Sequence, residues 1–422
     1  MALTTEAGEP RRSNGLSRCR VTNWRDRILQ YMLRLALSRG FLEVEKSLSI
    51  WHRLARRYGL RLLSAADIAV NGSRPWDLQI HDERLYLRCL LYGSLGFGEA
   101  YMEGWWDCEA IDELVCRLLT AQAPQQVGWL IQPLLGLDSR LINRQRGKGA
   151  FVIGRRHYDI GNDLYEAMLD RRMIYSCAYW DGGAQTLDEA QEAKLDLIAR
   201  KLELQPGMRV LDIGCGWGGT AQYLAERYGV QVVGITVSKE QAKLASERCR
   251  GLPVEIRLED YRQTQGKFDR ILSVGMFEHV GYRNYRTFMQ VARRLLKDDG
   301  LFLLHTIGAN VAYQGRDPWI ERYIFPNSML PSPRLITAAF EGLFVLEDWH
   351  NFGINYVATL KAWHANFERA WPQLAGRYGE RFRRLWRLYL LMSAGSFKAR
   401  ASQLWQLVLS PRGVRDGYRS VR

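Results

Sequence analysis

The stretch Arg209-Val-Leu-Asp-Ile-Gly-Cys-Gly-Trp-Gly-Gly219 decides the fold of this chain. Residues 210–213 form a short apolar run that predicts a buried β-strand, and the glycines after it predict a tight turn. Residues 220–228 then repeat apolar side chains along one stripe of a helix. A strand, a glycine turn and a helix in this order predict the ligand-binding corner of a doubly wound α/β sheet, because glycines let a ligand approach the backbone beyond the end of the strand.

The rest of residues 151–422 alternates strands with helices, which predicts a parallel, doubly wound sheet. Ser238 and Gln241 have the spacing of a capping box, so we expect a helix to begin there. The further strands that the pattern predicts lie at residues 230–237, 254–258, 270–274, 301–304, 345–348 and 404–409.

The chain is expected to have four parts. Residues 1–23 are polar and predict a mobile tail. Residues 24–126 predict a smaller amino-terminal α+β domain for lipid docking or dimerisation. Residues 127–150 predict an amphipathic basic linker, and residues 151–422 the catalytic domain.

The predicted linker joins apolar residues, Trp129 among them, to a group of basic residues. This composition is typical of a segment that lies in a membrane interface. It is also compatible with an interdomain linker whose apolar residues pack on the catalytic domain, and both interpretations stay open. A second arginine-rich stretch, residues 377–387, predicts either a solvated helix face or a membrane contact.

The net charge of +14 favours a polyanionic partner, either nucleic acid or the anionic surface of a membrane. No apolar run approaches the roughly 20 residues that span a bilayer, and the first residues lack the apolar core of a secretory signal. The seven cysteines form no Cys-x-x-Cys pair, which indicates reduced thiols. We therefore expect a cytoplasmic protein, and the spacing of its histidines predicts no metal site.

The glycine-rich stretch has the pattern Asp-x-Gly-x-Gly-x-Gly, unlike the Gly-x-Gly-x-x-Gly of dinucleotide-binding folds. Asp212, Gly214 and Gly216 carry this pattern, which resembles motif I of S-adenosylmethionine (SAM) methyltransferases. Asp212 ends its strand, so it either positions the cofactor or caps the glycine turn.

In many of these methyltransferases an acid ends the second strand and holds the ribose hydroxyls. Residues 235–238 contain no carboxylate here, so Thr236 and Gln241 are expected to supply the hydrogen bonds. Asp260 and Tyr261 follow the third strand. A carboxylate there accepts from the adenine amine while the aromatic ring packs on the base, so this pair predicts the adenine end of the site.

Five motifs resemble, in order and spacing, those of the bacterial cyclopropane-fatty-acyl-phospholipid synthases. Together the likeness covers about residues 60–420. The motifs are the glycine-rich stretch and Tyr175-Ser-Cys-Ala-Tyr-Trp180, Ser273-Val-Gly-Met-Phe-Glu-His-Val-Gly281, Leu303-Leu-His-Thr-Ile-Gly308 and Asp348-Trp-His-Asn-Phe-Gly-x-x-Tyr356. The resemblance implies a class I SAM-dependent methyltransferase sheet and places Tyr175 and Ser176 beside SAM.

The resemblance implies transfer of the SAM methyl to the cis double bond of an unsaturated acyl chain in a membrane phospholipid. The double bond attacks the sulfonium methyl, a carbocation forms on the chain, and a base removes a proton as the cyclopropane ring closes. The resemblance implies bicarbonate as that base. The residues that it implies as anchors are Cys177, Glu278, His305, Tyr356 and the backbone of Ile307.

Each of these residues also has a structural interpretation. Cys177 taken alone is more often an inert buried thiol, Glu278 would form an ordinary salt bridge, and Tyr356 begins a helical pattern and would belong to the core. Aromatic faces stabilise cations. The residues that composition and position offer for the carbocation are Tyr179, Trp180, Phe277 and Tyr323.

We therefore expect a homodimeric cytoplasmic enzyme that associates peripherally with the inner membrane, with unsaturated phospholipid and an anionic membrane surface as partners. One alternative is a related methyltransferase that stops at a methyl branch or acts on another lipid. The other is a basic module without activity that binds nucleic acid or lipid through a vestigial cofactor fold. No recognition motif supports nucleic acid as a partner, so none is expected.

Overall fold

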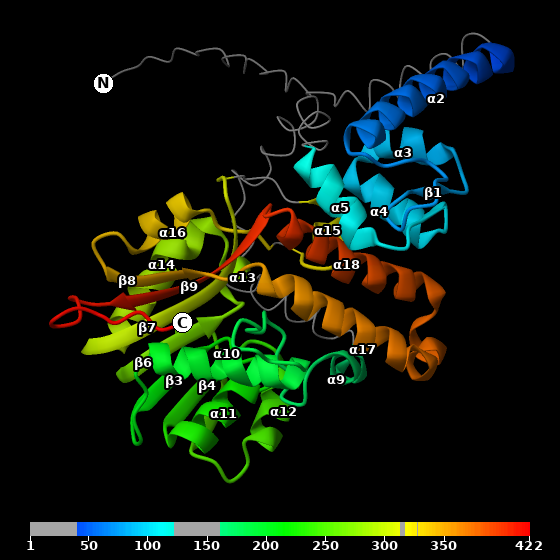
Figure 1. Cartoon of the computed structure of the whole chain (residues 1–422). Helices are drawn as coiled ribbons and strands as arrows, with labels where there is room; N and C mark the ends of the chain where they lie inside the picture. The colour runs from blue at the N-terminus through cyan, green and yellow to red at the C-terminus, as the bar shows by residue number, and fades with distance from the viewer. Residues whose placement is uncertain (1–39, 122–160, 313–316, 327) are drawn as a thin grey trace, which may run out of the picture. The chain divides into compact units, whose positions relative to one another are not determined.

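The computed structural model describes residues 40–121, 161–312, 317–326 and 328–422. The chain divides into two compact units, Met1–Leu54 and Ala55–Arg422, and helix α2 (Gly40–Ala65) contains the boundary. The second unit contains every strand of the described residues (Figure 1). The predicted tail and the predicted linker lie outside the described residues, so the four-part division of the chain stays a prediction.

A seven-stranded sheet forms the centre of this unit, with the strand order β5-β4-β3-β6-β7-β9-β8. Strands β3 to β7 run parallel to one another, whereas β9 is antiparallel to both of its neighbours. The sequence predicted all seven strands. They are β3 (Arg209–Ile213), β4 (Gln231–Thr236), β5 (Val254–Leu258), β6 (Phe268–Val274), β7 (Leu296–Ala309), β8 (Val345–Asn351) and β9 (Ser402–Ser410).

Strand β9 reverses direction because two helices, α17 (Asn355–Tyr378) and α18 (Glu380–Lys398), join it to β8. A single crossover helix returns the chain to begin a parallel strand, whereas a second helix turns the chain once more and makes the next strand antiparallel. The alternation of strands and helices in the sequence predicted a parallel sheet and did not reveal this reversal.

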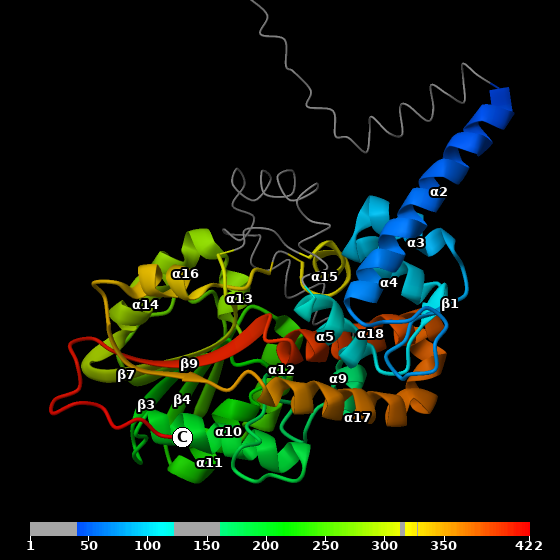
Figure 2. The same ribbon diagram turned by 45° about the horizontal axis from the view of Figure 1, so that its top comes forward.

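Helices cover both faces of the sheet (Figure 2). One face buries a hydrophobic cluster with α10 (Leu187–Lys201) and α11 (Gly219–Tyr228). The other face does so with α14 (Tyr285–Leu295) and α16 (Pro333–Phe340). A capping box of Thr186 and Glu189 begins α10. As predicted, α12 (Lys239–Arg248) begins at Ser238, whose side chain accepts from the amide of Gln241.

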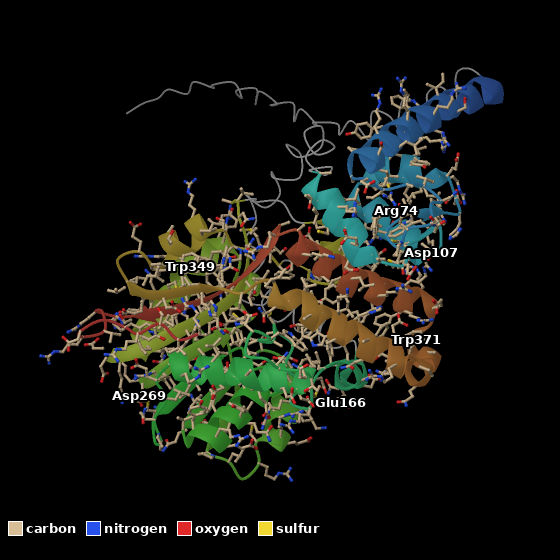
Figure 3. All side chains as sticks on the ribbon, in the orientation of Figure 1. Arg74, Asp107, Glu166, Asp269, Trp349 and Trp371 are labelled. Carbon is tan, nitrogen blue, oxygen red and sulfur yellow. The ribbon has the colours of Figure 1, made fainter. Side chains whose placement is uncertain are left out.

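A third hydrophobic cluster joins α17 and α18 to a group of short amino-terminal elements. These are α3 (Arg84–Tyr92), α4 (Ser94–Met102), α5 (Ile111–Thr120), β1 (Gln79–Ile80) and β2 (Trp106–Asp107). Arg384 of α18 fixes this packing by donating to the Asp107 carboxylate at 2.7 Å and to the Trp106 carbonyl at 2.9 Å. Figure 3 labels Asp107 among these amino-terminal elements. The mixture of short helices and a small antiparallel sheet agrees with the α+β character predicted for this region.

The turn after β3 depends on glycine at two positions. Gly218 has φ +82°, a left-handed conformation that glycine adopts without strain. At Gly219 a Cβ atom would lie 2.1 Å from the carbonyl oxygen of Arg172. Glycine therefore lets the segment that contains Arg172 approach the first turn of α11. The remaining elements are α9 (Asn162–Met168), α13 (Phe277–Val280), the 3₁₀ helix η2 (Tyr282–Asn284) and α15 (Pro318–Tyr323).

Candidate active site

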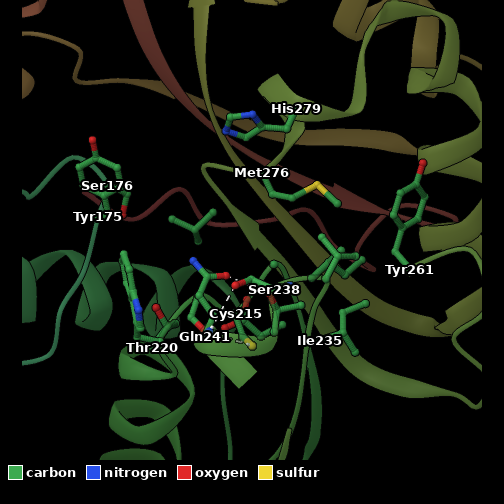
Figure 4. A pocket seen from close by; sticks show the side chains of 18 of the residues that line it. Tyr175, Ser176, Cys215, Thr220, Ile235, Ser238, Gln241, Tyr261, Met276 and His279 are labelled. Atoms are coloured by element: carbon green, nitrogen blue, oxygen red, sulfur yellow. Dashed lines mark hydrogen bonds between the residues drawn. The ribbon is translucent and has the colours of Figure 1, made fainter. Parts of the chain in front are cut away.

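A pocket opens beside the glycine turn, where β3, β4 and β6 end (Figure 4). This is the edge at which doubly wound sheets bind their ligands. All nine residues that the sequence predicts for the cofactor line the pocket, although their role there stays a prediction. They are Tyr175, Ser176, Asp212, Gly214, Gly216, Thr236, Gln241, Asp260 and Tyr261.

Asp212 lines this pocket and is only 2% exposed. Its Oδ2 atom has no hydrogen-bond partner among the described residues. Burial raises the pKa of Asp212 to about 7, and the nearby Lys194 ammonium acts against this shift. The carboxyl group therefore presents a buried acceptor to the pocket, as a group that positions a ligand would.

Lys194 of α10 is a fully buried cation that sequence reasoning missed. Its Nζ donates to the Ser176 hydroxyl at 2.9 Å. Burial lowers the pKa of Lys194 to about 8, whereas its interactions with Asp170, Cys177 and Asp212 raise it. One ammonium group thus faces the pocket wall and the predicted cysteine anchor together. The charge pattern of α10 in the sequence gave no sign that this lysine points inward.

A second side chain of α10 holds the same stretch of backbone. Gln191 donates from Nε2 to the carbonyl oxygens of Ile174 and Ser176, at 3.2 and 2.9 Å. Gln191 is fully buried. The extended residues 175–180 are therefore fixed to α10 by two buried polar side chains, and not only by apolar packing.

The end of β4 carries hydroxyl and amide groups at the place where many SAM methyltransferases have an acidic residue. Thr236 donates from Oγ1 to Gln241 Oε1 at 2.9 Å and accepts from the Ser238 amide at 3.2 Å. Figure 4 shows Gln241 and Ser238 together at this wall. The predicted replacement of a carboxylate by Thr236 and Gln241 therefore has both side chains in place and in contact.

The adenine prediction makes Asp260 a hydrogen-bond acceptor for the base. In the structure this carboxylate already has donors. Its carboxylate accepts from the Arg262 amide, Nε and Nη2. Burial raises the pKa of Asp260, but the hydrogen bonds from Arg262 outweigh burial and the net shift is downward. Beside it, the ring of Tyr261 packs edge-on against Phe288 at 5.3 Å between centroids. Arg262 is thus a further charged residue of this wall.

Two of the predicted anchors, Glu278 and Ile307, are in direct contact. The Ile307 amide donates to Glu278 Oε1 at 2.5 Å, while Glu278 Oε2 is buried without a partner in the described structure. Burial raises the pKa of Glu278 to about 7 against the opposing effect of this bond. The Ile307 amide therefore donates its hydrogen bond to the Glu278 carboxylate. This differs from its expected role, in which it binds an anion directly.

His305 lies two residues before Ile307 on β7 and is 1% exposed. Its Nδ1 is 3.2 Å from Gln406 Nε2, and its Nε2 atom has no partner among the described residues. Burial lowers the pKa of His305 far below its usual range, and Lys194 and Lys201 lower it further. The imidazole is therefore neutral at physiological pH.

Cys177 and Tyr356 belong to the third hydrophobic cluster, against which Ile307 also packs. The Cys177 thiol donates to the Ala178 carbonyl at 3.3 Å, and burial raises its pKa. The ring of Tyr356 lies 4.5 Å from that of Phe397. These residues are thus in the dry part of the site, with the thiol in its neutral form.

Phe352 connects this cluster to His305. Its ring lies 5.8 Å from the His305 ring and 5.4 Å from that of Tyr179, both edge-on. Trp180 donates from Nε1 to Thr359 in the same region. Tyr179 therefore packs on Phe352 and Trp180 contacts Thr359, while their role in stabilising a cation stays a prediction.

The two other aromatic candidates have different surroundings. Phe277 stacks on Tyr285 at 4.1 Å in the cluster of the opposite sheet face, because α13 turns its ring toward α14. Tyr323 donates from its hydroxyl to Glu99 at 2.8 Å. His279, which sequence reasoning considered only as a metal ligand, lines the pocket instead (Figure 4), and burial lowers its pKa to about 4.

Two general features of the described residues bear on the site. Nowhere among them do three or more His, Cys, Asp and Glu side chains gather as a metal ion would require. Within the same residues, no helix combines the length and the apolar composition needed to cross a bilayer.

Comparison with known proteins gives a consistent result. The mycolic acid cyclopropane synthetase family matches residues 146–407. The cyclopropane-fatty-acyl-phospholipid synthase of Escherichia coli K12 is 52% identical over 373 residues, which are 88% of this chain and 96% of that protein. The tuberculostearic acid methyltransferase UfaA1 of Mycobacterium tuberculosis is 32% identical over 402 residues, 88% of this chain and 92% of its own. The solved structure of mycolic acid cyclopropane synthase CmaA1 with SAH and CTAB matches with a TM-score of 0.58 and 33% identity, over 61% of this chain and 97% of that one.

Proposed function

Because the chain belongs to the mycolic acid cyclopropane synthetase family, we propose that it cyclopropanates the cis double bonds of unsaturated acyl chains in membrane phospholipids. Membership makes the chain a SAM-dependent methyltransferase of the lipid-cyclopropanating kind. The phospholipid acceptor is the finer proposal, supported by the name of the E. coli relative. One observation favours this function most: Ser176 lines the polar pocket, and Cys177, the next residue, lies in a dry, aromatic cluster.

The residues of the pocket fit SAM. Asp212 Oδ2 is a buried acceptor without a partner in the described structure, and Gly214 and Gly216 line the pocket without side chains of their own. When bound, SAM supplies an electrophilic methyl group on a sulfonium. Ser176, Thr236 and Gln241 offer hydrogen bonds to its polar groups. The pocket therefore orients a polar cosubstrate while Tyr175 and Ser176 separate it from the cluster that contains Cys177.

The aromatic cluster provides what an alkene acceptor needs. As the double bond takes the methyl group, positive charge develops on the acyl chain, and water would trap it. The ring of Phe352 contacts His305, and the ring of Tyr179 packs on Phe352, so both offer aromatic surface to a cation in this region. Exclusion of water and stabilisation by aromatic faces are thus the tasks of this part of the chain.

We propose that bicarbonate is the base that removes the proton when the ring closes. Glu278 Oε2 and His305 Nε2 are buried polar atoms with no partner among the described residues, as atoms awaiting a small planar ligand would be. A neutral imidazole can donate to an anion, and Glu278, with a pKa raised to about 7, can take up a proton near neutral pH. Cys177 and Tyr356 would complete the site from the cluster.

We also propose that the enzyme is a homodimer that works on the anionic surface of the inner membrane. The net charge of +14 favours attraction to such a surface. Two copies on one membrane would bind more tightly than one, because the second contact becomes intramolecular.

The test uses purified protein, SAM labelled in its methyl group, and vesicles of a cis-unsaturated phospholipid. We expect the label in the acyl chain as one added CH2 that resists hydrogenation, identified by mass spectrometry of the extracted lipid. Labelling of RNA in place of lipid, or no transfer to any vesicle, would overturn the proposal. Omitting bicarbonate from degassed buffer and restoring it tests the base, since turnover should fall and recover.

A methyl-branched product is the second candidate, favoured by the relative named tuberculostearic acid methyltransferase. The two outcomes share the methyl transfer. Loss of a proton from the new methyl group with ring closure gives the cyclopropane, whereas loss of a proton that leaves a double bond gives a branched alkene. Hydrogenation of the product separates them, because the branched alkene takes up hydrogen and the ring does not.

A further inference from the structure

His305 lies opposite Gln406 in the sheet. Strand β9 runs between β7 and β8, and the register pairs Gln406 with His305 on one side and with His350 on the other. Gln406 is fully buried, and the residues before and after it on β9, Trp405 and Leu407, belong to the cluster of the opposite face. The amide side chain therefore shares the face of the sheet on which His305 lies.

The contact between these side chains fixes the position of one proton. Gln406 Nε2 is 3.2 Å from His305 Nδ1, and an amide nitrogen can only donate a hydrogen bond. Nδ1 must then accept, and a neutral imidazole carries its single proton on the other nitrogen. That nitrogen, Nε2, is the buried atom with no partner among the described residues.

The surroundings of His305 keep its imidazole ring neutral. This matters because only a neutral ring has two tautomers, whereas a doubly protonated ring has none. Burial first, and then the ammonium groups of Lys194 and Lys201, hold the pKa of His305 far below its usual range. Lys201 is itself occupied by His350 Nδ1 at 3.1 Å and by Asp348 at 3.2 Å. The imidazole therefore stays neutral, and its hydrogen-bond partner decides which nitrogen donates.

We infer that Gln406 is a positioning residue that holds His305 in the tautomer with the proton on Nε2, so that Nε2–H is the donor the active site offers. The inference rests on the proposed catalytic role of His305. A purely structural role explains Gln406 less well, because its Oε1 atom is buried without a partner in the described structure, which an apolar side chain would avoid.

The first test measures the tautomer in the unaltered full-length protein. Histidine labelled with ¹⁵N in the ring gives separate NMR signals for protonated and unprotonated nitrogens, and the His305 signals are those lost in His305→Ala. We expect Nε2 protonated and Nδ1 unprotonated. A proton on Nδ1, or an equal mixture of the tautomers, would overturn the inference without any variant of Gln406.

The second test removes the donor with Gln406→Met, which keeps the approximate length of the side chain. We expect kcat to fall on the order of 10- to 100-fold, as when the partner that orients a functional histidine is lost. The KM for SAM should stay within about twofold, because the pocket is untouched. In this variant His305 should show both tautomers.

Gln403 provides a matched control on the same strand. It donates to the Arg400 carbonyl at 2.7 Å and accepts from Asn351 at 3.0 Å, three residues from Gln406 and away from His305. Gln403→Met should leave kcat and the His305 spectrum unchanged. Equal losses in both variants would assign Gln406 a structural role only. If His305→Ala retains turnover, the proposed site fails, yet the spectrum still reports the Gln406 contact separately.

Discussion

Lys194 donates a hydrogen bond to Ser176 over 2.9 Å, and both residues are buried beneath the cofactor pocket. The same ammonium group interacts with Asp212 and Cys177. One cation of α10 thus faces the polar pocket and the dry cluster at once. The first prediction follows from this contact.

Lys194→Met should weaken SAM binding without unfolding the protein. The Ser176 hydroxyl loses its donor, and Asp212 loses the cation that opposes its raised pKa, so more of it is protonated at neutral pH. We expect the KM for SAM to rise on the order of tenfold, the consequence of about 1–3 kcal/mol for an unsatisfied buried group. The melting temperature should fall only by a few degrees, because the unsatisfied Ser176 hydroxyl destabilises the folded state while the cost of burying the ammonium group is removed.

Lys239→Met is the control for this measurement, because it removes one positive charge from an exposed position at the start of α12. Its KM for SAM should match that of the unaltered enzyme. An equal rise in the KM for SAM in both variants would show that the loss of a positive charge, and not the loss of the Ser176 contact, weakens SAM binding.

His305→Ala should abolish turnover while leaving cosubstrate binding intact. His305 does not line the SAM pocket, and its Nε2 atom has no partner among the described residues. We expect kcat to fall by at least about 100-fold, the usual contribution of a proton-handling side chain. Calorimetry with SAH should give a Kd within about twofold of the original value.

His81→Ala is the matched substitution, because His81 is exposed and pairs with Asp107 on the small amino-terminal sheet. It should retain full kcat. Loss of SAH binding in His305→Ala would instead place that residue in the cofactor site.

Glu278→Gln should become more stable, relative to the unaltered protein, as the pH rises. Burial raises the pKa of Glu278 from its ordinary 4.5 to about 7 in the folded protein. Between these values the folded state holds a proton that the unfolded chain has lost, so the carboxyl group costs more stability as the pH rises toward 7. Glutamine has no such cost and still accepts from the Ile307 amide.

Urea unfolding at pH 5 and pH 8 checks this prediction. The advantage of Glu278→Gln in the free energy of unfolding should grow by about 2 kcal/mol between the two conditions. The variant should bind SAH normally and lose turnover. A stability difference that is the same at both pH values would contradict a buried carboxyl with a raised pKa.

Gly219→Ala should distort the pocket by displacing a neighbouring backbone segment. Its Cβ would lie 2.1 Å from the Arg172 carbonyl oxygen, so the segment that leads to Tyr175 and Ser176 must move. We expect a destabilisation of about 1–3 kcal/mol and a higher KM for SAM. Gly182→Ala, where no atom lies within 4 Å of the added Cβ, should change neither quantity in thermal unfolding and kinetic assays.

Much of the fold was accessible from the sequence because its signals are local. The apolar run before Gly214 predicted β3, and the spacing of Ser238 and Gln241 predicted where α12 begins. The residues predicted to bind the cofactor lie in one pocket because parallel strands end at the same edge. The reversal of β9 was not predicted, since it depends on α17 and α18 packing as a pair, which no local pattern encodes.

The parts of the site that the sequence did not reveal depend on contacts between distant residues. Gln406 reaches His305 across 101 positions of the chain. The residues around Lys194 in the sequence of α10 do not indicate that this lysine points inward. Only the structure shows that it is buried. Phe277 stands next to Glu278 in its motif, yet the short helix α13 turns its ring to the opposite face.

Strand β9 has a consequence for biosynthesis. It follows every other described strand along the chain, yet it lies between β7 and β8 and gives β8 its hydrogen-bonded neighbour. A nascent polypeptide that has emerged only as far as α18 therefore exposes two unpaired strand edges and lacks the glutamine beside His305. We expect such an intermediate to bind chaperones, and the active site to be complete only once β9 (Ser402–Ser410) has left the ribosome.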